Sequence, residues 1–391
     1  MDPIANPFAP GAGSRPPSLA GREKILDDVR IALGRIKAGR HAKSIMMLGL
    51  RGVGKTVLLV RSGELAEERD YIPMLIEAPE EKSLAALMVP QLRVVLYRLS
   101  KFEKARTLAN RALGALRSFA SVFKVAYGEF EVGIEAEPAF ASGDLETDFT
   151  ELLIVVANAA RAAERPVAIL VDEVQYLEEQ DLAALIVAMH KIGQKGLPVV
   201  LIGAGLPQLA ALSGEIKSYA ERLFQFINVG PLDTTSARDA IAVPIHTAGE
   251  QIDVDAIELI VTKTEGYPYF LQEWGSHAWN TANASPISLS DVVNASNQAV
   301  AALDDSFFRV RFDRLTHREQ DYLRAMAALG KGPYRSGDIA GKLGIKVTSA
   351  GPLRTGLIKK GMVWSPSHGE TEFTVPMFAE FMMRVMPDWQ P

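Results

Sequence analysis

The sequence of 391 residues contains no cysteine. Disulfide bonds, thiolate zinc sites and cysteine nucleophiles are therefore excluded, and a reducing compartment is the natural location. The six histidines are scattered and form no H-E-x-x-H pair. The sequence thus gives little support for a hydrolytic zinc site.

Long apolar runs are also missing. No stretch approaches the roughly 18 uninterrupted apolar residues that a membrane-spanning helix needs. The N-terminus lacks the basic and then apolar layout of a signal peptide. We therefore expect a cytoplasmic protein with no membrane partner. Hydrophobic residues make up 48% and charged residues 23% of the chain, values typical of a globular protein, and its length allows two or three domains.

The net charge of −5 conceals an uneven distribution. Between residues 309 and 363 there are twelve Lys or Arg against four acidic residues, which gives this segment a charge of +8 and the remainder −13. A basic C-terminal segment on an acidic body suggests a polyanionic partner such as duplex DNA.

The segment GLRGVGKT at 49–56 fits the phosphate-binding pattern G-x-x-x-x-G-K-[ST]. An apolar run at 45–48 precedes it and another at 57–60 follows, as expected for a strand, a glycine loop and a helix. We predict that Lys55 reaches the β- and γ-phosphates of ATP and that Thr56 places its hydroxyl on Mg²⁺. The predicted nucleotide-binding residues of this segment are Gly49, Leu50, Arg51, Gly52, Val53, Gly54, Lys55, Thr56 and Val57.

An acidic pair follows a second apolar run. Residues 167–171 are continuously apolar and lead into Asp172 and Glu173, and residues 199–203 form a further run. Buried strands that alternate with helices predict a parallel α/β sheet, whose ligands bind beyond the carboxyl ends of the strands. There, Asp172 would bind Mg²⁺ and Glu173 would polarise the attacking water.

The pattern along the chain predicts four parts. They are a flexible N-terminal arm (1–17), a P-loop ATPase core (18–232), a helical lid (233–305) and a C-terminal winged helix (306–391). The core carries an insertion at about 80–150, in which an apolar stripe over 84–99 predicts a covering helix and strict alternation over 130–135 predicts a hairpin strand.

Three motifs together resemble the bacterial and archaeal AAA+ ATPases related to the origin-recognition initiators and to the STAND signalling ATPases. They are the segment 49–56, Val171–Gln175 and Gly266–Pro268. The resemblance implies an AAA+-like P-loop NTPase with a sheet of order 5-1-4-3-2, which places Pro73 on an edge strand. It also implies that Ala20 and Gly21, in an adenine-side box, and Pro268, in the lid, contact the nucleotide.

Arg222, which precedes the fifth strand, matches the arginine that the family supplies to a neighbouring subunit, although an ordinary surface arginine fits the sequence as well. The family's first sensor is usually a polar side chain at the end of the fourth strand, where this chain has Gly203–Gly205. The lid helix after Pro268 carries no arginine. These departures keep open the alternative that the protein is a nucleotide-binding subunit with little turnover.

The C-terminal segment predicts three helices, at 316–329, 336–343 and 348–360, and a wing of two strands at 362–364 and 372–375. We expect four basic residues on or beside the third helix to face outward and contact DNA: Lys346, Arg354, Lys359 and Lys360. The leading hypothesis is an ATP-dependent switch that engages DNA. A second copy of the chain, in a homo-oligomer, or another protein is a further candidate partner. The alternative is a STAND-like signalling ATPase whose winged helix docks protein.

Overall fold

The computed structural model describes residues 1–11, 13–79, 82–125 and 142–390. By their internal contacts these residues form two compact units. The sheet unit comprises Glu23–Gly49 and Lys55–Asn228. The C-terminal unit comprises Met1–Arg22, the loop segment Leu50–Gly54 and Val229–Pro391.

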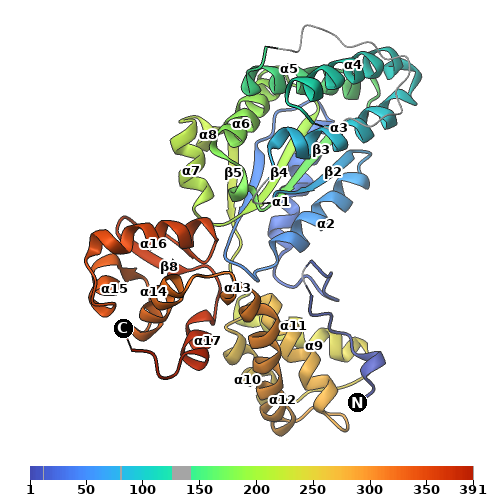
Figure 1. The fold of residues 1–391 in the computed structure, drawn as a ribbon. Helices are drawn as coiled ribbons and strands as arrows, with labels where there is room; N and C mark the ends of the chain where they lie inside the picture. Colours follow the sequence, from blue (N-terminus) through green and yellow to red (C-terminus); the bar gives the residue numbers. More distant parts are fainter. Residues whose placement is uncertain (12, 80–81, 126–141, 391) are drawn as a thin grey trace. The chain divides into compact units, whose positions relative to one another are not determined.

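A five-stranded parallel sheet is the centre of the sheet unit (Figure 1). Its strands are β1 (Ser44–Leu48), β2 (Ile72–Glu77), β3 (Val167–Asp172), β4 (Val199–Gly205) and β5 (Phe224–Asn228). They lie in the order β2-β3-β4-β1-β5, which confirms the predicted order and places β2 at an edge. Pro73 is tolerated there because an edge strand does not need every backbone N–H for pairing.

Helices surround this sheet, some packed on its strands and others on neighbouring helices. They are α1 (Glu23–Lys37), α2 (Lys55–Glu67), α3 (Leu84–Ser100), α4 (Arg106–Val122), α5 (Leu145–Ala162), α6 (Glu179–Gln194), α7 (Leu209–Ile216) and α8 (Ala220–Leu223). Along β3, Val167, Ile169 and Val171 belong to the core shared with α3 to α6, whereas Leu170 contacts Gly63 of α2. Because side chains alternate along a strand, helices cover both faces, which explains why every residue of β3 is apolar before Asp172.

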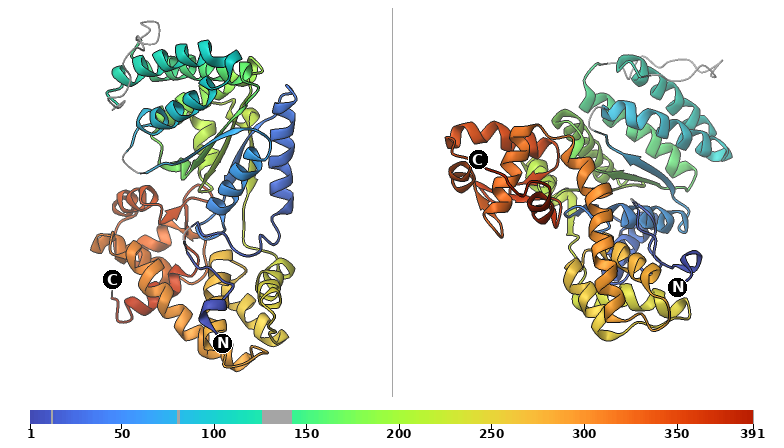
Figure 2. Two further views of the ribbon diagram at one scale, coloured as in Figure 1. Left: turned by 90° about the vertical axis from the view of Figure 1, so that its right-hand side faces the viewer. Right: turned by 60° about the horizontal axis from the view of Figure 1, so that its bottom comes forward.

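Among the described residues of the insertion, α3 packs on α4, and α4 packs in turn on α5, which begins near the end of the insertion (Figure 2). The predicted apolar stripe on α3 is buried in the core, so its interpretation as a covering helix is confirmed. The sequence pattern did not predict α5. The hairpin strand expected over 130–135 lies outside the described residues.

The C-terminal unit contains four helices in the segment 233–305, which was predicted to be helical. They are α9 (Thr234–Thr247), α10 (Val254–Thr264), α11 (Pro268–Thr281) and α12 (Leu289–Ala302). A π-helical turn (Leu303–Phe308) and α13 (Arg309–Phe312) follow. Among the described residues, no helix is both long and apolar enough to cross a membrane.

The remaining C-terminal residues form three helices and a small sheet. The elements are α14 (His317–Ala328), β6 (Tyr334–Arg335), α15 (Ser336–Lys342), α16 (Val347–Lys359), β7 (Val363–Trp364), β8 (Glu370–Phe373) and α17 (Phe378–Val385). Helix α14 begins with a capping box, in which the side chains of Thr316 and Glu319 each accept the other residue's backbone N–H. Strand β8 pairs with both β6 and β7, and β6 and α17 are additions to the predicted pattern.

The prediction of a flexible N-terminal arm is wrong for Met1–Ala9, which bind along α11. Phe8 is 6% exposed, and its ring lies where a Cβ on Gly275 would approach to 2.5 Å. The amide of Asn6 donates to Asn280 Oδ1 at 2.9 Å, and Trp279 Nε1 donates to the carbonyl of Asp2 at 2.8 Å. The proline-rich composition suggested disorder because it does not reveal these distant partners.

Gly275→Ala should release this arm. The added methyl group collides with the Phe8 ring, and overpacking of this kind costs about 1–3 kcal/mol. Hydrogen exchange over residues 1–9 should rise and the free energy of unfolding should fall. Gly34→Ala in α1 is the matched control, because nothing lies within 4 Å of a Cβ at that position. Unchanged exchange in Gly275→Ala would contradict the packing described for Phe8.

Candidate functional site

The predicted magnesium ligands Thr56 and Asp172 lie together in the sheet unit. Thr56, in the first turn of α2, donates its hydroxyl to Asp172 Oδ2 at 2.6 Å. The other carboxylate oxygen, Oδ1, accepts the backbone N–H of Glu173 at 2.9 Å. Strands β1 and β3 both pair with β4, so the residues after their carboxyl ends meet at one edge of the sheet.

Asp172 is a buried acid at the last position of β3, with 6% of its surface exposed. Burial raises the pKa of its carboxyl, and the neighbouring charge of Glu173 raises it further. The hydrogen bond from Thr56 and the charge of Lys55 act in the opposite direction, but the pKa stays above its usual value. A carboxylate and a hydroxyl are oxygen ligands of the kind that Mg²⁺ takes, and a cation would favour the charged form of this buried acid. The two residues therefore fit a bound Mg²⁺.

Lys55 is 7% exposed, and its ammonium group donates to the carbonyl of Gly49 at 3.0 Å. Gly49 in turn donates its N–H to the carbonyl of Gly205 at the end of β4, at 3.1 Å. The first glycine and the lysine of the motif are thereby fixed to the sheet. Buried phosphate oxygens are stronger acceptors for an ammonium group than a carbonyl, so ATP would compete for Lys55.

Glu173 has a left-handed backbone, with φ 52° and ψ 40°, which is uncommon for a residue with a Cβ. Gln175 Nε2 donates to Glu173 Oε2 at 2.5 Å. The other atom of the same amide, Gln175 Oε1, accepts the N–H of Leu206 at 3.0 Å. Residues in unfavourable backbone conformations gather at functional sites, which fits the role predicted for Glu173.

The middle of the glycine loop, Leu50–Gly54, belongs to the C-terminal unit by its contacts. Gly52 and Gly54 have φ of 81° and 90°, and such angles favour glycine. The carbonyl of Gly52 accepts the N–H of Tyr269 at 3.1 Å, and the carbonyl of Val53 accepts a guanidinium N–H of Arg22 at 3.1 Å. Contact of Leu50 and Val57 with a nucleotide stays a prediction.

The residues implied as adenine contacts also come together in the C-terminal unit. A Cβ on Gly21 would meet the hydroxyl of Ser236 at 2.5 Å. A Cβ on Gly266 would meet the carbonyl of Leu232 at 2.4 Å, and Pro268 is the first residue of α11. Ala20 is partly buried beside the same core. This close packing explains the two glycines, and contact of these residues with a nucleotide stays a prediction.

Arg222 is exposed on α8, next to the edge strand β5. This exposure suits either a surface arginine or one that is offered to another subunit, so the structure leaves the two alternatives as the sequence did. All seven residues of β4, including Gly203–Gly205, are buried. No side chain of β4 supplies a polar group at its end, but Gln175 brings its amide there.

Two of the four predicted DNA contacts do not face outward. Arg354 binds β8 and the residue after β7, through Thr371 Oγ1 at 2.8 Å, Ser365 Oγ at 2.6 Å and the carbonyl of Glu370 at 2.9 Å. Lys360 binds Glu319 Oε2 at 2.7 Å. The expectation of an outward orientation is therefore wrong for Arg354 and Lys360, because oxygen atoms of residues distant in the sequence accept their N–H groups.

The buried acid that holds Lys360 shows how strong that interaction is. Burial alone would raise the pKa of Glu319, but the hydrogen bonds from Lys360 and Thr316 lower it below its usual value. Lys346 and Lys359, by contrast, are exposed at the two ends of α16. Of the four predicted DNA contacts, these two are the ones whose position fits the prediction.

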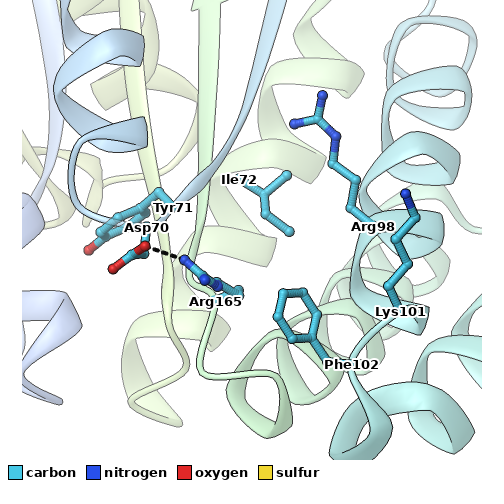
Figure 3. A pocket seen from close by; sticks show the side chains of 7 residues that line it. All are labelled: Asp70, Tyr71, Ile72, Arg98, Lys101, Phe102 and Arg165. Atoms are coloured by element: carbon cyan, nitrogen blue, oxygen red, sulfur yellow. Dashed lines mark hydrogen bonds and ion pairs between the residues drawn. The ribbon is translucent and has the colours of Figure 1, made fainter.

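A hollow lies at the opposite, amino-terminal end of the strands (Figure 3). It has a volume of about 280 Å³ and is lined by Asp70, Tyr71, Ile72, Arg98, Lys101, Phe102 and Arg165. Arg165 pairs with Asp70 and lies over the Phe102 ring, 5.4 Å from its centroid. This hollow includes none of the predicted nucleotide-binding residues.

Comparison with known proteins agrees with the motif and the sheet. Residues 18–202 match the family profile described as the AAA ATPase domain. This part of the chain is therefore similar to AAA ATPase domains. Residues 305–382 match a second profile, described as a domain of unknown function (DUF8462). No curated protein matches the chain by comparison.

Solved structures also resemble the chain. The Walker-type ATPase PABY2304 of Pyrococcus abyssi matches with a TM-score of 0.59 at 17% identity, over 94% of this chain and 97% of that one. The RuvB Holliday junction branch migration motor of Thermotoga maritima has a TM-score of 0.47 at 15% identity, over 97% and 100%. ORC1 of Aeropyrum pernix, solved in complex with DNA, has a TM-score of 0.47 at 14% identity, over 94% of each chain. The first similarity shows that the chain shares the fold of that Walker-type ATPase.

Thr56→Val should destabilise the protein even without nucleotide. It leaves one buried oxygen of Asp172 without its donor, which costs about 1–3 kcal/mol of unfolding free energy. Thr56→Ser keeps the hydroxyl and is the matched control, with an expected change below about 1 kcal/mol. Urea unfolding measures both. Equal stability of the two variants would show that the Thr56–Asp172 hydrogen bond contributes nothing.

Proposed function

We propose that the protein binds ATP with Mg²⁺, hydrolyses it, and uses the difference between the nucleotide states as a switch. The observation that carries the proposal is the hydrogen bond of 2.6 Å between Thr56 and Asp172, which joins the glycine-loop motif to the acidic motif. Two short motifs, 116 residues apart in sequence, supply neighbouring oxygen ligands. Chance matches to either motif would not meet in this way.

Each residue then has a defined part in the chemistry. Lys55 and the loop N–H groups bind phosphate oxygens, and the N-terminus of α2 faces the same charge. Thr56 and Asp172 hold Mg²⁺, which when bound neutralises charge on the phosphates. Glu173 orients the attacking water and accepts its proton. Arg222 is proposed to stabilise the transferring phosphoryl group in a neighbouring subunit, and its exposure beside β5 is compatible with this.

A contact inside the C-terminal unit suggests how the switch is read. Arg51, within the glycine loop, donates its backbone N–H to the carbonyl of Thr374 at 3.0 Å. Its side chain donates to the carbonyl of Gly361 at 3.5 Å. Both acceptors border the wing strands, so this contact supports the STAND-like alternative, in which the C-terminal module docks on the nucleotide-binding loop and engages protein.

DNA engagement is the second candidate for the output of the switch. It is supported by the basic charge of residues 309–363 and by the exposure of Lys346 and Lys359 at the two ends of α16. Only these two of the predicted contacts enter the proposal, since Arg354 and Lys360 have structural partners. With so few base-reading groups available, binding would be mostly electrostatic and weakly sequence-specific.

Glu173→Gln should bind ATP and fail to turn it over, because the variant keeps the phosphate-binding residues and loses the base. Loss of a general base typically lowers the rate by a factor of about 10²–10⁴. Nucleotide retention and phosphate release measure the two effects. Lys55→Ala is the companion variant and should lose ATP binding. Equal turnover by wild type and Glu173→Gln would contradict the proposed hydrolysis.

Lys346→Ala/Lys359→Ala should weaken binding to duplex DNA. If each lysine meets one phosphate, the magnitude of the slope of log affinity against log salt should fall by about two. Lys24→Ala/Lys43→Ala removes two exposed lysines from the sheet unit and should leave the slope unchanged. No affinity of the wild type for duplex DNA at low salt, with or without ATP, would reject DNA engagement and favour protein docking.

A further inference from the structure

We propose that Gln175 is a positioning residue for hydrolysis, which holds the carboxylate of Glu173 from the end of β4. The inference rests on the proposed function, because it gives the water-activating role to Glu173. Its basis is a chain of three hydrogen bonds inside the sheet unit. These join the start of the glycine loop to β4, β4 to Gln175, and Gln175 to Glu173.

The orientation of the Gln175 amide is fixed by the backbone. Its Oε1 accepts the N–H of Leu206 at 3.0 Å, and an N–H group cannot bond the amide nitrogen in its place. Nε2 must then point away from Leu206, and it donates to Glu173 Oε2 at 2.5 Å. The hydrogen bond to Leu206 therefore determines which end of the Gln175 amide faces Glu173, and that end is the NH₂ donor.

The end of β4 is shaped to receive this amide. A Cβ on Gly205 would lie 2.8 Å from Gln175 Oε1 and 3.0 Å from Leu209 Cδ2. The carbonyl of the same glycine accepts the N–H of Gly49 at 3.1 Å. Because Gly205 has no Cβ, it leaves room for the Gln175 amide, and its carbonyl accepts the hydrogen bond from the glycine loop.

Glu173 needs such a restraint. Its left-handed backbone is fixed locally by the hydrogen bond of its N–H to Asp172 Oδ1, but its side chain has further torsions to set. A carboxylate that must hold water in one place loses rate when it moves, and a displacement of about 1 Å can cost about 10²-fold. The side chains of β4 offer no polar group at this end, so Gln175 supplies from the loop after β3 what the strand lacks.

Steady-state ATP hydrolysis and ATP binding, measured on the full chain with Mg²⁺, test this assignment. Gln175→Ala should lower kcat on the order of ten- to a hundredfold because Glu173 loses this hydrogen bond and is held less firmly. Its affinity for ATP should stay within about twofold of wild type, because the ground-state contacts are kept. Gln180→Ala is the matched control. Gln180 is exposed and donates to Glu178 Oε2 at 3.1 Å, so this pair has the same two-residue spacing as Gln175 and Glu173. Its loss should change neither kcat nor the affinity for ATP.

Two further variants separate positioning from folding. Gly205→Ala keeps Gln175 but pushes its amide aside, so kcat should fall, and should fall no further when Gln175→Ala is added. In the Glu173→Gln background, Gln175→Ala should cause no added loss, because Gln175 acts through Glu173. An independent, multiplicative loss in that background would overturn the assignment, as would full kcat in Gln175→Ala.

The same assays distinguish this inference from the proposed function. Wild-type protein without turnover, or with turnover equal to that of Glu173→Gln, overturns the proposed hydrolysis and the role of Gln175 with it. Wild-type turnover that Glu173→Gln removes and Gln175→Ala leaves intact overturns the role of Gln175 alone.

Discussion

The burial of one acid, Asp172, sets the requirements for the rest of the candidate site. Its carboxylate ends a strand that is covered on both faces, where an unpaired charge is expensive. Thr56 and the N–H of Glu173 each satisfy one of its oxygens. The parallel sheet makes this possible, because β4 pairs with both β1 and β3 and so aligns the loops that follow them.

Much of the fold could be predicted because its signals are local. Strands β1, β3 and β4 each contain an uninterrupted apolar run, and the lid helices have clear boundaries and periodic apolar positions. The pattern failed where the signal was weak or short. Helix α5 is apolar over much of its surface because other helices pack around it, and β6 has only two residues. The arm at Met1–Ala9 depends on partners more than 260 residues away.

The residues of the candidate site also fall into those that local motifs predict and those whose role depends on distant partners. Lys55, Thr56, Asp172 and Glu173 belong to motifs that carry their chemistry within a few residues, and in the structure Thr56 is hydrogen-bonded to Asp172. Sequence reasoning missed Gln175, although it lies two residues after Glu173. Its significance depends on Leu206 and Gly205, which reach it through the fold. Likewise, counting charge over 309–363 could not show that Arg354 is bound by β8 and Lys360 by Glu319.

The position of Pro73 has a consequence for how the sheet behaves toward other chains. An open edge strand is a template on which a second strand can add, and proteins protect such edges with proline and charged side chains. Strand β2 carries both, since Pro73 removes one N–H from its ladder and Glu77 is exposed at its end. Intermolecular sheet extension, and the aggregation that follows from it, is therefore disfavoured along β2, so association of copies through this edge would have to use side chains.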